Sequence, residues 1–419
     1  MKKSLHKHSL LKRNLLKRSL LKRSLHKHSL KCFRVLFLTL LLILFSCQEM
    51  PKLNFSGDDG VIRNITTAAL IHQMGLGINL GNTFEATGSW ISPTVAAHET
   101  AWGSPIITKQ MIQGYKNAGF KTLRIPVAWS NLMEMSAYTI NSDLLNRIQV
   151  IVNWTREADM YAIVNLHWDG GWIENFPANY NECMKRYTRI WEQVAERFKN
   201  YGDYLLFESQ NEELGFDSLW NKWGGTGTAN MEGKTKAYEI VNAINQKFVD
   251  VIRASGGNNP YRHLLIAGYH TNIDNTCDQL FKMPDDPVNR MAVKVHYYDP
   301  FGFTHLEKDE SWGTATWTWG TNTERSQLNN ELNKMVTNFI NKGIPVAIGE
   351  YGIAKKDLSE AEIRNYTLAV TEAMYIRGML PLLWDVQLND QPNYYYNRRI
   401  QKMTDSALET GMKKIAASR

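Results

Sequence analysis

Eight compact apolar runs recur along the chain, each seven or eight residues long. This length is typical of β-strands. The runs are Met74–Leu80, Thr122–Trp129, Tyr161–Trp168, Leu205–Glu212, His263–Tyr269, Met291–Tyr298, Pro345–Tyr351 and Leu380–Val386. Their apolar residues are nearly continuous rather than alternating with polar ones, which indicates strands that are buried on both faces, as in a parallel sheet.

Helical patterns separate most of these runs. Apolar residues recur every three or four positions in Ser142–Met160, Tyr180–Tyr201, Lys234–Ala254, Glu324–Lys342 and Ser359–Arg377. Apolar strands that alternate with helices predict a parallel sheet covered by helices. Eight such units in about 350 residues favour an α/β fold of the (β/α)8 TIM-barrel type. A doubly wound open sheet is the alternative, although no dinucleotide-binding glycine motif follows the first run.

The amino-terminal segment differs in composition from the rest. Residues 1 to 34 contain 12 Lys or Arg and no Asp or Glu, in repeats that could also form an amphipathic helix on a membrane surface. The apolar run 35–45 is shorter than the roughly 20 residues that span a bilayer, but it suits a signal-peptide core. Leu44-Phe45-Ser46-Cys47 resembles the lipobox of bacterial lipoproteins, in which the cysteine is acylated. We therefore expect an exported lipoprotein of the bacterial cell envelope, anchored at Cys47, with simple secretion as the alternative.

The remaining sequence reads as one domain. We divide the chain into a leader and signal peptide (1–47), a short tether (48–61) and a single domain (62–419). Beyond residue 34 there are 36 basic and 41 acidic residues, a net charge of −5, so the pI of 9.0 does not indicate nucleic-acid binding. Two cysteines, Cys183 and Cys277, lie in the domain. They are too few for a disulfide framework or a cysteine-type zinc site, and we expect two separate thiols.

Chemically active residues lie toward the carboxyl-terminal ends of the apolar runs. They are Arg124, His167, Asn211, Glu212, His296, Tyr298, Glu350 and Trp384, and we call them the rim residues. Each alone has an ordinary structural explanation, such as a buried ion pair or packing. However, the carboxyl ends of the strands in a (β/α)8 barrel all face the active site. Eight such residues on one rim therefore predict a functional site.

Two of the rim residues are glutamates, 138 positions apart. A pair of carboxyl groups that converge on one cleft suits cleavage of a glycosidic bond. We predict that Glu350 is the nucleophile, kept ionised by Arg124 and by a hydrogen bond from Tyr298. We predict that Glu212 is the acid/base, which keeps its proton because a second negative charge lies nearby, with His296 as its hydrogen-bond partner.

The other rim residues are suited to binding a sugar. Asn211 is placed to contact a 2-hydroxyl, His167 to bind in the same subsite, and Trp384 to stack on the pyranose ring. Eleven of the 13 tryptophans lie at strand ends or in the segments after them, although we expect about half to pack inside loops. The segments Gly313–Asn322 and Trp220–Gly233 are expected to line distal subsites.

Several motifs resemble one enzyme family. Gly-Ile-Asn-Leu-Gly-Asn-Thr at 77–83, Glu-Thr-Ala-Trp-Gly-Ser-Pro at 99–105 and Phe207-Glu208-x-x-Asn211-Glu212, together with the rim residues, resemble glycoside hydrolase family 5. They look most like the endoglucanases and xyloglucanases of its subfamily 4. The resemblance covers nearly all of residues 65 to 419. It implies that 62–419 is a catalytic domain that hydrolyses β-1,4-glucans with retention, without a metal or cofactor. Nothing in the sequence suggests an obligate assembly, and we expect a monomer.

Two positions depart from the family pattern. Glu213 stands where members usually have proline, and it adds a charge beside Glu212. Trp168 stands where many members have a second histidine. Neither change removes a catalytic group, and we expect effects on subsite preference or pH optimum.

Two other classes of protein are alternatives. A metal-dependent hydrolase could use His167, Asp169, His270 and His296 as ligands, but the chain lacks the His-x-His pattern usual for barrel metal sites. A non-catalytic surface glycan-binding protein could use the same barrel, but such proteins normally lose a carboxylate. The preferred polysaccharide, among cellulose, mixed-linkage glucan, xyloglucan, mannan and xylan, depends on variable loops.

Overall fold

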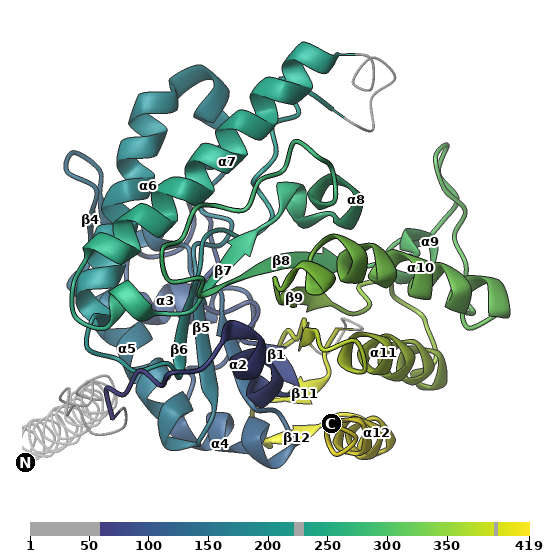
Figure 1. Cartoon of the computed structure of the whole chain (residues 1–419). Coiled ribbons are helices and arrows are strands. Elements are labelled where there is room, and N and C mark those ends of the chain that lie inside the picture. The colour runs from purple at the N-terminus through teal and green to yellow at the C-terminus, as the bar shows by residue number, and fades with distance from the viewer. Residues whose placement is uncertain (1–58, 222–229, 389–392) are drawn as a thin grey trace, which may run out of the picture. The chain divides into compact units, whose positions relative to one another are not determined.

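The chain folds into a closed barrel of eight parallel strands (Figure 1). The computed structural model describes residues 59–221, 230–388 and 393–419, which belong to one compact unit; the expected leader and most of the tether lie outside them. The strands follow the order β1-β10-β9-β8-β7-β6-β5-β2 around the barrel. They are β1 (Gly77–Asn79), β2 (Thr122–Ile125), β5 (Tyr161–Asn165), β6 (Leu205–Glu208), β7 (Leu264–Ala267), β8 (Met291–Tyr297), β9 (Val346–Tyr351) and β10 (Leu380–Leu383). The prediction of a TIM barrel is confirmed, and the open sheet is excluded.

Helices cover the outside of the barrel (Figure 1). They are α3 (Val95–Thr100), α4 (Lys109–Asn117), α5 (Ser142–Glu157), α6 (Phe176–Phe198), α7 (Met231–Ala254), α8 (Ile273–Thr276), α9 (Phe301–Thr304), α10 (Asn322–Asn338), α11 (Glu360–Tyr375) and α12 (Ser406–Ala416). Each of the five predicted helical segments overlaps a helix: α5, α6, α7, α10 and α11. Helix α6 shows why the periodicity was informative, because Tyr187, Ile190, Trp191 and Val194 form one buried stripe.

All eight predicted runs extend beyond the strands that form, and two of them show why. The run Met74–Leu80 begins with the last residue of helix α2 (Thr67–Met74), which Thr66 caps by accepting a hydrogen bond from the amide of Ala69. Gly75 ends this helix with a φ of 60°, a value that glycine adopts without strain. The run Leu205–Glu212 leaves the sheet after its fourth residue, so its last four residues form a loop above the rim.

The amino-terminal end of the barrel is closed by apolar packing. Leu70, Ile71 and Met74 of α2 belong to one buried cluster with barrel residues that include Leu206 and Leu265. Polar chemistry is thereby left to the opposite, carboxyl-terminal end. None of the described helices is long and apolar enough to cross a membrane.

Short antiparallel ribbons and two cysteines complete the fold. The ribbons are β3 (Met133–Glu134) with β4 (Thr139–Ile140), and β11 (Tyr396–Asn397) with β12 (Lys402–Met403). Cys183 and Cys277 are both free, which confirms the expectation of two separate thiols.

Candidate active site

Arg124 of β2 organises the carboxyl-terminal end of the barrel. It is fully buried, and all five of its N–H groups donate. Nε and Nη2 bond the two carboxylate oxygens of Glu208 at 2.8 and 2.7 Å. Nη1 bonds Glu350 Oε1 and Asn79 Oδ1, both at 2.8 Å, and Nη2 also bonds Asn211 Oδ1 at 2.9 Å. Because a guanidinium group is planar and rigid, these contacts fix the side chains around it.

Glu208 and Lys294 form part of this network, although no role was predicted for either. Lys294 Nζ lies 3.2 Å from Glu208 Oε1 and donates to the carbonyl of Asn211 at 2.9 Å. Burial alone would raise the pKa of Glu208, but the charges of Arg124 and Lys294 lower it to about 2. A charged residue within an apolar strand is costly unless it is paired, so both residues were recognisable from the sequence.

Glu350 lies near the end of β9 and is buried. One of its oxygens accepts the bond from Arg124, and the other accepts the Tyr298 hydroxyl at 3.1 Å. Burial raises the pKa of Glu350, and the positive charges of Arg124 and Lys294 together with the Tyr298 hydroxyl oppose this rise. The carboxylate is thus held in place at both oxygens.

Glu212 projects from the loop after β6, and its side chain is 53% exposed. Its Oε2 lies 3.1 Å from His296 Nδ1. One carboxyl oxygen each from Glu212 and Glu350 and one ring nitrogen of His296 lie within 4.8 Å of one another. Desolvation by the surrounding protein and the negative charges of Glu350 and Glu213 raise the pKa of Glu212 to about 8. One carboxyl group therefore favours the protonated state near neutral pH.

His296 is positioned by a lysine. Lys294 Nζ lies 3.4 Å from its Nε2 and can only donate, so the hydrogen on Nδ1 faces Glu212. Burial and the neighbouring positive charges of Lys294 and Arg124 lower the pKa of His296 far below its usual value. The neutral imidazole is therefore a hydrogen-bond donor to the Glu212 carboxyl group.

His167 and Trp384 form a stacked pair of rings close to Glu350. Their rings are stacked, with centroids 5.6 Å apart and planes 4° apart. Asn165 Nδ2 donates to His167 Nδ1 at 3.2 Å, which places the ring hydrogen on Nε2. That nitrogen lies 4.0 Å from Glu350 Oε1. All eight rim residues are thus linked by direct contacts at one end of the barrel.

Glu213, one of the two departures from the family pattern, is buried beside the site. Its two oxygens accept hydrogen bonds from Gln210 Nε2 at 2.8 Å and from Asn211 Nδ2 at 3.2 Å. Because Asn211 Oδ1 already accepts from Arg124, the Asn211 amide is held at both ends. Within the described residues the second amide hydrogen of Asn211 has no acceptor, so it can donate to a ligand.

The structure does not assemble the ligand set of the metal alternative. The Asp169 carboxylate accepts hydrogen bonds from Ser130 and Trp172, and His270 contacts Asp217. Within the described residues, the one group that could hold a metal is Glu212, His296 and Glu350. The first and last of these are the predicted catalytic pair.

The tryptophans divide as expected between packing and exposure. The buried ones are Trp129, Trp172, Trp191, Trp220 and Trp319, and those at least 40% exposed are Trp90, Trp168, Trp312 and Trp317. The expected subsite segment Gly313–Asn322 contains one exposed tryptophan, Trp317, and one buried tryptophan, Trp319. Most of the other segment, Trp220–Gly233, lies outside the described residues.

The spacing of the two carboxyl groups has a chemical meaning. Carboxyl groups about 5–5.5 Å apart are typical of retaining glycosidases, whereas inverting enzymes separate theirs by about 6.5–9.5 Å. One oxygen of Glu212 and one oxygen of Glu350 lie within 4.8 Å of each other, a close approach that agrees with the retaining arrangement. A (β/α)8 barrel that carries such a pair at its carboxyl-terminal end is typical of a glycoside hydrolase.

Comparisons with known proteins agree. The family Cellulase (glycosyl hydrolase family 5) matches residues 84–413, and the chain belongs to this family. Endoglucanase B of Clostridium cellulovorans is 34% identical over 77% of this chain and 69% of its own length. The xyloglucan-specific endo-beta-1,4-glucanase of Bacteroides ovatus is 35% identical over 78% of this chain and 66% of its own length.

Solved structures give the same result. A GH5-4 broad-specificity endoglucanase from an uncultured bovine rumen ciliate has a TM-score of 0.75 and 31% identity, covering 85% of this chain and 99% of the other. A family 5 lichenase from a Caldicellulosiruptor species has a TM-score of 0.74 and 31% identity, covering 88% and 99%. The chain is therefore a glycosidase of the endoglucanase type.

Proposed function

We propose that the two glutamates cleave the glycosidic bond by double displacement. Glu350 attacks the anomeric carbon while Glu212 protonates the leaving oxygen, and Glu212 then removes a proton from the water that releases the glycosyl-enzyme. The observation that carries this proposal is the close approach of the two carboxyl groups. Their different environments support the roles, because Glu350 is fixed by two donors and Glu212 has a pKa of about 8.

The remaining rim residues bind the sugar beside the nucleophile. The free amide hydrogen of Asn211 contacts the 2-hydroxyl, and the Nε2 hydrogen of His167 contacts a neighbouring hydroxyl. Trp384 offers an indole face on which the ring stacks. The stacking of Trp384 on His167 keeps both in place in the absence of substrate.

The substrate that we propose is a β-1,4-linked glucan, including mixed-linkage glucan and xyloglucan. The names of the relatives support this choice, because they include a lichenase, a xyloglucan-specific enzyme and a broad-specificity endoglucanase. The exposed tryptophans Trp90, Trp168, Trp312 and Trp317 offer aromatic surfaces on which further sugar rings could stack.

The test is reducing-sugar release by the full chain and its Glu350→Ala variant. The substrates are carboxymethylcellulose, mixed-linkage β-glucan, xyloglucan, xylan and glucomannan. We expect release from the β-glucans by the wild type alone, and the panel also ranks mannan and xylan. A folded wild type that binds glucan but releases no sugar from any polymer would instead indicate a non-catalytic glycan-binding protein.

We also propose that the protein is exported and anchored through a lipid on Cys47. The apolar run and the lipobox-like sequence support this localisation. Radiolabelled palmitate is expected on the wild type and not on Cys47→Ser, and absence of label on both would contradict the anchor. We expect the enzyme to act as a monomer, which sedimentation analysis would check.

A further inference from the structure

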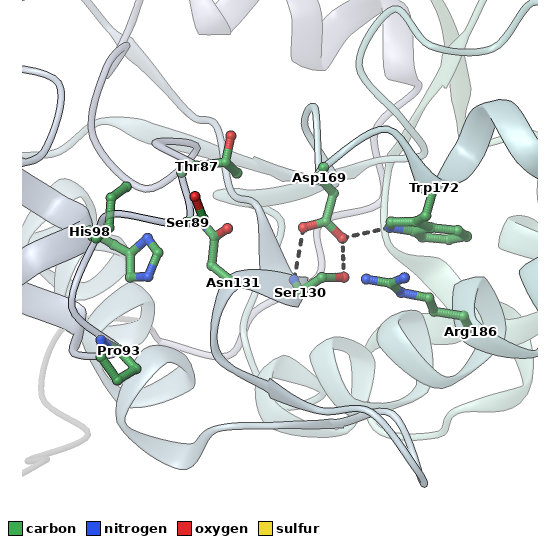
Figure 2. A pocket seen from close by; sticks show the side chains of 12 residues that line it. Thr87, Ser89, Pro93, His98, Ser130, Asn131, Asp169, Trp172 and Arg186 are labelled. Carbon is green, nitrogen blue, oxygen red and sulfur yellow. Dashed lines mark hydrogen bonds between the residues drawn. The ribbon is translucent and has the colours of Figure 1, made fainter.

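A polar pocket of about 380 Å³ lies among the loops that follow β1, β2 and β5, at the same end of the barrel as the catalytic pair (Figure 2). Its volume lies within the range of about 300–1,000 Å³ that is typical of small-molecule sites. None of the rim residues lines it, but Asp169 on its wall is only two residues beyond His167. Thr87 and Ser89 bring hydroxyl groups to it. The pocket is therefore close to the proposed sugar site without belonging to it.

The pocket is lined by Arg186, a cation with one buried donor that no acceptor among the described residues satisfies. Arg186 of α6 lies over the ring of Trp172 at 4.5 Å. Its Nε is buried and has no hydrogen-bond partner within the described part of the chain. Burial lowers the pKa of Arg186. A buried guanidinium nitrogen without an acceptor is unusual, because an unpaired donor costs free energy.

The nearby carboxylate does not supply the missing acceptor. Asp169 accepts hydrogen bonds from the Ser130 amide at 2.8 Å, from the Ser130 hydroxyl, and from Trp172 Nε1 at 2.8 Å. Figure 2 shows these bonds and the guanidinium group of Arg186 beside them. Asp169 is thus held by its own partners, and the planar fork of Arg186 can receive a ligand that carries two oxygens.

Exposed indole rings lie next to this pocket. Trp90 is 68% exposed and packs against the backbone of Gly88, where an added Cβ would come 2.5 Å from its Nε1. Trp168, the second departure from the family pattern, lies 3.9 Å from the corresponding position of Gly171. Aromatic faces beside polar groups are typical of surfaces that bind sugar rings.

We propose that this pocket binds an acidic sugar, a uronic-acid unit of the polysaccharide, whose carboxylate pairs with Arg186. The inference rests on the proposed function, because it assumes that a glucan chain occupies the neighbouring site. A carboxylate matches the two parallel donors of a guanidinium group. A neutral sugar unit would bring no carboxylate to the guanidinium donors of Arg186, and the pocket would then give no preference for anionic substrates.

The experiment compares two forms of one soluble β-glucan, untreated and with part of its C6 hydroxyls oxidised to glucuronate. For the full-length protein, the ratio of kcat/KM on oxidised to untreated polymer is measured at low salt. We expect a preference of about tenfold for the oxidised form, the size of one charge-assisted hydrogen bond. Arg186→Gln should abolish the preference, and Arg186→Lys should keep part of it, because the charge is retained without the fork.

The matched control is Arg189→Gln. Arg189 lies on the same helix but is exposed and paired with Glu192, so this variant should retain the full preference. Equal rates of the wild type on both polymers, or a preference that survives in Arg186→Gln, would overturn the proposal. Thermal unfolding of each variant separates loss of fold from loss of recognition.

A binding arm separates this proposal from the proposed function. Glu350→Ala, alone and combined with Arg186→Gln, is run through gels that contain either polymer. We expect the oxidised polymer to retard Glu350→Ala more strongly and to lose this advantage in the double variant. Stronger retardation without hydrolysis by the wild type would support the pocket and reject the glucanase; equal retardation would reject the pocket alone.

Discussion

Two arginines are fully buried at the carboxyl-terminal end of the barrel, and their surroundings differ. Arg124 pairs with two carboxylates, and one of these, Glu350, lies beside the half-exposed Glu212. Arg398 lies in the turn after β11 and is held mainly by neutral oxygens. Its partners are the hydroxyls of Tyr115, Thr83 and Ser104, the carbonyls of Gly81 and Asp385, and the Asp385 carboxylate at 3.4 Å.

The difference shows what a buried charge needs in order to serve chemistry. Asp385 is occupied by the amides of Tyr395 and Tyr396, and burial raises its pKa to about 7 in spite of Arg398. The network around Arg398 therefore joins the segments after β1 and β10 and presents no acid to a substrate. In the network around Arg124, by contrast, one donor bonds Glu350, the carboxylate that faces the substrate site.

The largest expected effect comes from Glu350→Ala, which removes the reacting member of the Arg124 network. We expect kcat on soluble β-glucan to fall by about 10⁴-fold or more, as for other nucleophile deletions. The fold should survive, because Arg124 keeps its bidentate pair with Glu208. Kinetics and thermal unfolding measured together check both statements, and activity within 100-fold of the wild type would show that the nucleophile is another residue.

Glu212→Gln should have the next largest effect. Loss of the proton donor should slow hydrolysis of unactivated cello-oligosaccharides by about 10²–10⁴-fold. Aryl cellobiosides with good leaving groups need little protonation, so their glycosylation step should be affected much less. The comparison of the two substrate types is the measurement, and equal losses on both would contradict the acid/base assignment.

Arg398→Met tests the other side of the comparison. The substitution leaves five neutral oxygens and the Asp385 carboxylate without their buried donor, which we expect to cost about 3–5 kcal/mol of unfolding free energy, and urea denaturation would measure this loss. At temperatures where the variant remains folded, its kcat should stay close to that of the wild type. A folded Arg398→Met protein without activity would mean that this network also serves the reaction.

The smallest effect is expected from Glu213→Gln. The negative charge of Glu213 helps to raise the pKa of Glu212 to about 8. Its removal lowers that pKa, and since Glu212 must be protonated to act as the acid, the alkaline limb of the kcat/KM profile should move to lower pH by about half a unit to one unit. Glu239→Gln, an exposed change on α7, is the control. A shift to higher pH would contradict this electrostatic role.

The same comparison explains how much could be predicted from the sequence. The residues around Arg124 lie in or directly after apolar strands, so one rule, that strand ends face the site, was enough to collect them. Arg398 and Thr83 are 315 positions apart and lie in loops without periodicity. The pocket around Arg186 was missed for the same reason, because its walls come from three separate loops. Helix α2 was missed because its last residue, Met74, was assigned to the first apolar run.

The closure of the barrel between its first and last strands has a consequence for folding. Strand β1 pairs with both β2 and β10, and Asn79 on β1 donates to the carbonyls of Gly349, Leu382 and Leu383 while it accepts from Arg124. The hydrogen bonds of Asn79 that position Arg124 thus join β1, the first strand of the barrel, to β9 and β10, the last two. A chain that ends before β10 should therefore be inert, even though it contains both Arg124 and Glu350, and activity should appear only when the last barrel strand is in place.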